Sequence, residues 1–303
     1  MKNAFAHIHP FSKFIISLII IVLSFLIVFF IGLIIAIPTF DLNIFELQST
    51  MSNYSDPNSI RLLKYMQTIQ SFGIFIIPAF IIAFIFSKQP NEYLCLNKKR
   101  HYSLFILTTF ILICSIPLIN YFGVLNIRMD LPDWLSSIEI WMQNQENRAK
   151  LLTEAFLTMP NIGSLFFNLF MIAVLPAIGE ELIFRGIFQK LFIEWTKSIY
   201  WGIILSAFLF SFIHFQFYGF LPRFMLGLLF GYLFYRSGSI WIPILAHFVN
   251  NSLAVLSSYS TPDLESKVEN LSLLNPGLII TTIIASLICY VLLVRFYKKT
   301  RKS

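Results

Sequence analysis

The chain has 303 residues, of which 57% are hydrophobic and 34 are phenylalanine, and its mean hydropathy is +0.76. Soluble domains contain roughly 45 to 50% apolar residues, so this composition excludes an ordinary soluble protein and indicates one that crosses a membrane several times. The net charge of +7 does not predict nucleic-acid binding, because the basic residues stand mainly beside the ends of apolar segments.

Eight apolar segments approach the length of about 20 residues that a helix needs to cross a bilayer. They predict an all-α fold, a polytopic bundle of about eight transmembrane helices with a polar cavity inside the membrane. The first segment is longer than the ~7–15 apolar residues of a signal peptide, and we expect it to remain attached. The expected spans are 14–37, 71–86, 103–122, 161–193, 199–215, 220–235, 240–256 and 276–296.

The distribution of lysine and arginine predicts the orientation. An even number of spans puts both termini on one side, together with most of the basic residues, and the positive-inside rule makes that side the cytoplasm. The connections 38–70 and 123–160 hold more acids than bases and are expected outside. Heavy use of Ile, Phe, Asn and Lys is typical of an AT-rich bacterial genome. We therefore predict an integral protein of a bacterial inner or plasma membrane.

The chain divides into three predicted parts. Residues 1–160 hold three spans and an amphipathic segment, 131–159, in which Trp134, Ile138 and Trp141 have helical spacing. This segment is expected to lie along the outer membrane surface, and a solvent helix packed on the outer loops is the alternative. Residues 161–257 form the predicted catalytic core, and 258–303 add a final span with a basic tail.

An acidic cluster in the expected fourth span is the strongest functional signal. Charged side chains at membrane depth are costly, so Glu180, Glu181 and Arg185 indicate a functional site. Glu181 and Arg185 are four residues apart, the spacing of a helical ion pair. Glu180 is left without a partner at that spacing, which makes it the candidate general base.

Polar residues in two later spans can meet this cluster. If the fourth and fifth segments form a hairpin, Glu180 and His214 both lie about 24–27 Å from its turn and reach similar height. His247 and Asn251 share one face of the seventh helix, and Asn250 is close to Asn251 in angle. Three helices can therefore contribute to one cavity. The alternative is a structural network that only joins the helices.

Gly227 and Gly231 form a Gly-x-x-x-Gly step in the expected sixth span. Such a step lets two helix backbones approach closely, so we predict a packing role.

Three motifs in this order resemble the CPBP family of intramembrane proteases, which includes the CAAX prenyl endopeptidases and bacterial proteins linked to bacteriocin self-immunity. The similarity covers about residues 161–256, a third of the chain. The motifs are Glu180-Glu181-x-x-x-Arg185, Phe210-x-x-x-His214 and His247-x-x-x-Asn251, with Gly227, Gly231, Ser239, Trp241 and Pro243 before the last.

The resemblance implies a conical cavity open to the cytoplasm. Within it, Glu180 and His214 would activate a water molecule, and His247 with Asn251 would hold the oxyanion. Glu181 and Arg185 would support the site. The predicted function is an intramembrane endopeptidase that cleaves a membrane-associated or lipid-modified substrate near the cytoplasmic face without a cofactor.

Three alternatives remain at this stage. Zinc held by Glu180, His214 and His247 would make the protein a metalloprotease, although the spacing is not that of a His-Glu-x-x-His helix. A non-catalytic immunity or scaffold protein could retain the cavity. A proton-coupled transporter is disfavoured, because the informative polar residues all lie in the C-terminal half rather than in related halves.

Overall fold

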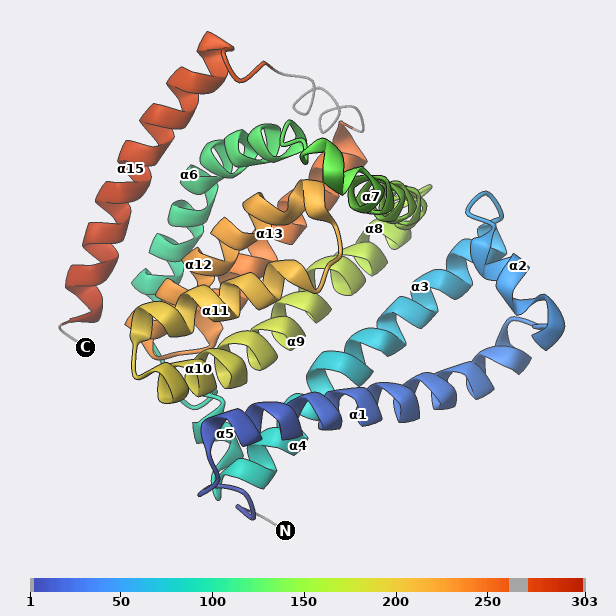
Figure 1. Cartoon of the computed structure of the whole chain (residues 1–303), viewed down its shortest axis with the longest axis horizontal. Helices are drawn as coiled ribbons and strands as arrows, with labels where there is room; N and C mark the ends of the chain where they lie inside the picture. The colour runs from blue at the N-terminus through green and yellow to red at the C-terminus, as the bar shows by residue number, and fades with distance from the viewer. Residues whose placement is uncertain (1–2, 262–271, 302–303) are drawn as a thin grey trace.

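The computed structural model describes residues 3–261 and 272–301, and within these ranges every regular element is a helix (Figure 1). Lys2, Lys302 and Ser303, which belong to the predicted cytoplasmic ends, lie outside the described residues. The longer helices are α1 (Pro10–Thr39), α3 (Pro57–Ser71), α4 (Ile77–Phe86), α6 (Tyr102–Ile127), α7 (Ser136–Phe156), α11 (Ile199–Phe212), α12 (Phe220–Ser237), α13 (Trp241–Ser260) and α15 (Pro276–Thr300). The shorter helices are α2 (Leu47–Ser52), α5 (Pro90–Tyr93), α8 (Ile162–Asn168), α9 (Leu175–Ile183) and α10 (Gln189–Thr196). Turns of 3-10 helix occur at Ile44–Glu46, Asp133–Leu135 and Phe217–Gly219, and turns of π-helix at Phe72–Ile76, Leu169–Val174 and Phe184–Phe188.

Six helical stretches in the described residues are long and apolar enough to cross a membrane, judged by length and composition. α11, with 14 residues, is apolar but shorter, and α13 has 20 residues but carries His247, Asn250 and Asn251. These eight match the eight predicted segments, so the all-α, polytopic membrane bundle is confirmed. The six stretches are Pro10–Thr39, Pro57–Phe86, Tyr102–Ile127, Ile162–Thr196, Phe217–Ser237 and Pro276–Thr300.

The second span begins much earlier than predicted. α3, a π-turn and α4 form one stretch of 30 residues, Pro57–Phe86, where the sequence pattern placed an outer connection up to residue 70. Asp56 starts the helix by accepting a hydrogen bond from the Ser59 amide at 2.9 Å. Lys64 made this segment look like a polar connection in the sequence. In the structure it is buried, and its ammonium donates a hydrogen bond to the Thr158 carbonyl at 3.0 Å.

The fourth span continues through the acidic cluster. Ile162–Thr196 is a helical stretch of 35 residues in which two π-turns separate α8, α9 and α10. It ends where Lys197 takes a left-handed backbone conformation with φ of 55°. Glu180 and Glu181 lie on α9, between the two π-turns, and widened turns of this kind are frequent at functional sites.

The fifth span ends earlier than predicted. α11 stops at Phe212, so His214 lies in the turn that follows the helix rather than inside it. Phe215 has a left-handed φ of 51°, which ends the helical path and directs the chain into the 3-10 turn before α12.

The amphipathic segment forms α7, as its spacing predicts. Its Trp141 ring packs on Phe217 with centroids 5.4 Å apart, and Glu146 accepts a hydrogen bond from the Tyr218 amide at 3.4 Å. α7 therefore contacts the loop that follows His214. Its placement on the membrane surface remains a prediction.

The α9–α10 stretch lies inside the bundle. It packs against α4 and α11, while α13 packs against both α9 and α6 (Figure 1). This position surrounds the acidic cluster with other helices.

Candidate active site

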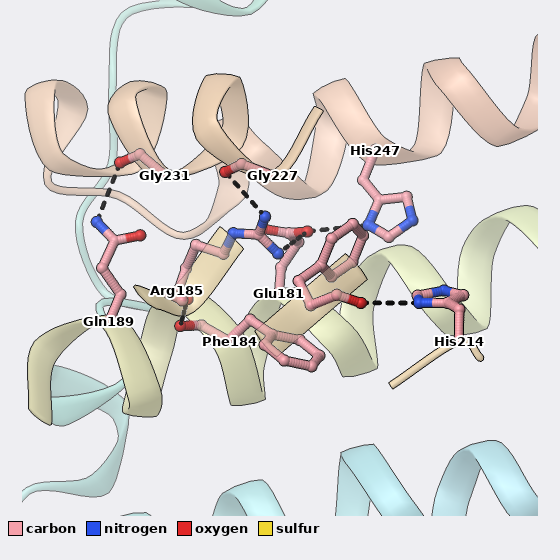
Figure 2. Close-up of polar contacts among 10 residues, drawn as sticks. Glu181, Phe184, Arg185, Gln189, His214, Gly227, Gly231 and His247 are labelled. Carbon is pink, nitrogen blue, oxygen red and sulfur yellow. Dashed lines mark hydrogen bonds and ion pairs between the residues drawn. The ribbon is translucent and has the colours of Figure 1, made fainter. Parts of the chain in front are cut away.

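Glu181 is the centre of the polar network. Its Oε1 accepts a hydrogen bond from Arg185 Nη1 at 2.9 Å and another from His247 Nδ1 at 2.9 Å (Figure 2). Glu181 and Arg185 are both fully buried. The expected ion pair along the helix is present, and the same carboxylate also joins α9 to α13.

Arg185 is surrounded by groups that suit a cation, although its buried Nε has no hydrogen-bond partner among the described residues. Its Nη2 donates to the Gly227 carbonyl at 3.2 Å, and its Cζ lies 4.6 Å from the Phe210 ring centroid and 5.4 Å from that of Phe230. A buried guanidinium needs such compensation, because removing it from water costs several kcal/mol. These contacts fix the π-turn Phe184–Phe188 against α11 and α12.

Gln189 extends the network by one helical turn, and sequence reasoning missed it. It is fully buried, and its amide donates to the Gly231 carbonyl at 3.0 Å (Figure 2). Arg185 and Gln189 thus meet Gly227 and Gly231 at matching four-residue spacings. The only signal in the sequence was that Gln189 stands four residues after Arg185.

The two glycines also bring α12 close to α11. A Cβ built on Gly227 would lie 2.9 Å from the Ala207 Cβ and 3.0 Å from its Cα. The close approach that the Gly-x-x-x-Gly step predicts is present, and it is what brings the glycine carbonyls within reach of α9 and α10.

Phe210 lies between the two histidines. Its ring is 5.4 Å from the His214 ring and 5.9 Å from the His247 ring, measured between centroids. Its carbonyl oxygen is 2.8 Å from His214 Nδ1 (Figure 2). Because a carbonyl can only accept, Nδ1 carries the proton, and in a neutral ring Nε2 keeps a lone pair that can take a proton.

His247 has the opposite requirement. Its Nδ1 donates to the Glu181 carboxylate, so a hydrogen bond donated from Nε2 requires the doubly protonated ring. The Glu181 carboxylate lies 2.9 Å from Nδ1, and Phe230 stacks on the ring with centroids 5.2 Å apart.

Glu180 differs from its neighbour in having no fixed partner. No hydrogen bond or ion pair reaches its carboxylate from the residues that the structure describes. It remains 9% exposed, whereas Glu181 is fully enclosed. The two adjacent carboxylates therefore differ in both hydrogen bonding and exposure.

Asn251 is fixed by the first π-turn of the acid-bearing stretch. Its Nδ2 donates to the Ile172 carbonyl at 2.9 Å, and its Oδ1 accepts from Asn250 at 3.1 Å. The sequence left open which of the two amides matters, and Asn251 is the one that contacts the Leu169–Val174 turn. At the second π-turn, Ser206 Oγ donates to the Phe184 carbonyl at 2.9 Å. A side chain from a neighbouring helix thus binds a carbonyl at each turn.

Arg223, on the first turn of α12, is a second residue that sequence reasoning missed. It donates to the Gln216 carbonyl at 3.2 Å and to Gln216 Oε1 at 2.5 Å. Gly219 leaves room for it, since a Cβ there would lie 2.5 Å from an Arg223 nitrogen. The loop after His214 therefore holds a cation at the start of α12. Nothing in the spacing of the three motifs indicates this residue.

Comparison with known protein families identifies the segment that holds this site. Residues 162–253 match the family model described as type II CAAX prenyl endopeptidase Rce1-like. This segment, about a third of the chain, is similar to that family. It contains all three motifs, so the resemblance drawn from them is confirmed, and the family is one of proteases. No curated protein and no solved structure matches the chain.

The zinc alternative requires that the candidate ligands of this segment lie close enough together to bind one metal ion. Among the described residues, no three His, Cys, Asp or Glu side chains stand together as metal ligands. Glu180, His214 and His247 do not form such a set in this conformation.

Proposed function

We propose that the protein is an intramembrane endopeptidase that hydrolyses a peptide bond of a membrane-associated or lipid-modified substrate. The proposal rests on the Rce1-like segment and on the different environments of the two adjacent carboxylates. Glu181 binds Arg185 and His247, while Glu180 keeps a free carboxylate. The difference between the two carboxylates is the observation that assigns the role of general base to Glu180 and a supporting role to Glu181.

In the proposed reaction, Glu180 removes one proton from a water molecule, and His214 Nε2 accepts a hydrogen bond from its other O–H. The water oxygen attacks the peptide carbonyl carbon, and the carbonyl oxygen becomes an oxyanion. His247 Nε2–H and an Asn251 N–H donate to that oxyanion, which is the electrostatic stabilisation that lowers barriers of this kind. As the C–N bond breaks, Glu180 returns its proton to the leaving amine, and His214 receives the second proton of the water.

Glu181 supports this step through His247 rather than by contact with substrate. An oxyanion donor at Nε2 requires the doubly protonated ring, and the Glu181 carboxylate 2.9 Å from Nδ1 orients that ring. Arg185 Nη1 donates to the same carboxylate oxygen and fixes its position.

The decisive experiment compares purified wild type with Glu180→Gln on a library of membrane peptides. We expect cleavage by the wild type and none by Glu180→Gln, at equal yield and melting temperature. Glu154→Gln, an exposed carboxylate on α7, is the matched control and should retain full activity. Equal cleavage by folded Glu180→Gln would refute the role of Glu180 as the general base. Absence of cleavage by the wild type across the library would favour a non-catalytic immunity or scaffold protein.

A further inference from the structure

A cavity of about 500 Å³ lies between α6, α12 and α15, separate from the candidate active site. α15 packs mainly along α6, which leaves a gap beside α12. The walls are apolar, formed by residues such as Leu118 of α6, Leu229 of α12 and Leu293 of α15. Two tyrosines of α15 at its edge, Tyr290 and Tyr297, are 67% and 42% exposed, so the cavity is an open groove.

The position of this groove limits what can fill it. All three helices belong to stretches that are long and apolar enough to cross a membrane. Apolar cavities of this kind hold hydrocarbon rather than water, because water finds no polar partners in them. A groove of about 300 to 1,000 Å³ is in the range of small-molecule sites, so one lipid chain is an occupant of suitable size and chemistry.

One end of the groove is cationic. Tyr232 and Tyr297 line that end, and the Arg236 guanidinium lies 4.1 Å from the Tyr297 ring centroid. Among the described residues, the acceptors of Arg236 are neutral: Thr300 Oγ1 and the Tyr297 carbonyl, each at 3.4 Å. Within the described residues, neither it nor Lys298 forms an ion pair with a carboxylate. Basic residues at the membrane-facing end of a helix attract anionic lipid headgroups.

We propose that this groove binds one anionic phospholipid, with an acyl chain beside Leu229 and Leu293 and the phosphate at Arg236. An uncharged isoprenoid or neutral lipid would suit the walls but would leave the cationic end without a counter-ion. The site stands independently of the proposed peptidase activity.

Binding at this groove would also support the candidate active site. The face of α12 opposite the groove carries Gly227 and Gly231, which accept hydrogen bonds from Arg185 and Gln189. A lipid that fills the gap between α12 and α15 would hold that helix in position.

The test measures lipid binding by the full chain. Wild-type protein in nanodiscs that contain equal amounts of phosphatidylglycerol and phosphatidylcholine is released into the gas phase, and native mass spectrometry identifies the retained lipid. We expect one phosphatidylglycerol per chain. Arg236→Gln should weaken its retention about fivefold, as loss of one basic contact near the membrane surface predicts. Leu229→Trp, which fills the groove, should remove the bound lipid.

Two matched controls separate this site from general effects. Lys88→Gln removes an exposed charge elsewhere, and Ile288→Trp enlarges an exposed position of α15 outside the groove, so both should retain the lipid. Equal loss of lipid in Arg236→Gln and Lys88→Gln would overturn the proposal. If Leu229→Trp fails to fold, the lipid retained by the wild type still tests the proposal. Equal retention of phosphatidylglycerol and phosphatidylcholine would contradict an anionic lipid site. Retention of a co-purified isoprenoid in place of phosphatidylglycerol would contradict it as well.

Discussion

At the residue scale, two adjacent carboxylates have different surroundings because consecutive residues of a helix point about 100° apart. Glu181 accepts hydrogen bonds from Arg185, one helical turn later in the chain, and from His247 of α13. Among the described residues no hydrogen bond reaches the Glu180 carboxylate, and Glu180 keeps its partial exposure. One residue therefore supports the structure, and the other is available for chemistry.

Glu181→Ala should strongly destabilise the protein. It removes the acceptor of both Arg185 and His247, and breaking a buried ion pair from one side costs about 3–5 kcal/mol. The melting temperature in detergent measures this effect. Glu181→Gln retains an oxygen acceptor and should lose less. A melting temperature of Glu181→Ala equal to that of Glu180→Ala would contradict the assignment of the buried pair to Glu181.

His247→Ala should lower turnover on the order of a hundredfold to a thousandfold, the effect of removing one oxyanion donor. Chelation should leave wild-type activity intact if Glu180 and His214 act on water alone. Turnover with and without a strong chelator, together with elemental analysis of both proteins, provides the measurement. Stoichiometric zinc in active wild type that is lost from His247→Ala would instead establish the metal mechanism.

The sequence predicted the side-chain contact along one helix and the close helix approach at Gly227, but not the side-chain contacts between helices. Glu181 and Arg185 are four residues apart, so their pairing follows from helical geometry alone. The contact of Glu181 with His247 spans 66 positions and depends on how α9 packs on α13. The Gln189 contact with Gly231 and the position of Arg223 depend on tertiary packing in the same way.

At the element scale, charge and turn geometry explain where the predicted boundaries were wrong. Lys64 made the first half of the Pro57–Phe86 stretch resemble a polar connection, although its burial and hydrogen bond compensate for the charge. α11 was predicted to continue past His214, because an apolar run does not reveal the left-handed residue Phe215. The π-turns leave no recognisable hydrophobic periodicity in the sequence, so their positions could not be predicted either.

The contact between α11 and α12 provides a test of helix packing with an internal control. In Gly227→Ala the added methyl group would lie 2.9 Å from the Ala207 Cβ, so the helices must separate and the Arg185 contact must lengthen. We expect a loss of about 1–3 kcal/mol, the usual cost of overpacking. Gly123→Ala adds a methyl group on α6 that meets nothing within 4 Å, and alanine is the better helix former, so stability should be equal or higher. Equal melting temperatures of the two variants would contradict the close approach.

At the scale of the whole molecule, the ends of the bundle differ in charge. The Lys98 carbonyl accepts from Ser239 at 2.7 Å and Arg236 contacts Thr300, so these basic segments gather at one end. The loop after His214 lies at the other end of α12, where α7 contacts it through Glu146 and Tyr218. The charge rule puts the first end in the cytoplasm and this loop towards the outside. The resemblance, in contrast, implies a cavity that opens to the cytoplasm.

Cysteine labelling of intact cells decides between these two expectations. In a background without Cys95, Cys114 and Cys289, single cysteines would replace Lys99, Arg301, Gln143 or Tyr218. From the charge distribution we expect a membrane-impermeant reagent to label Gln143→Cys and Tyr218→Cys in intact cells, and Lys99→Cys and Arg301→Cys only after the membrane is opened. Labelling of Lys99→Cys in intact cells would reverse the predicted orientation. Labelling of both Gln143→Cys and Tyr218→Cys only after opening would place the loop after His214, which α7 contacts, in the cytoplasm, as the resemblance implies.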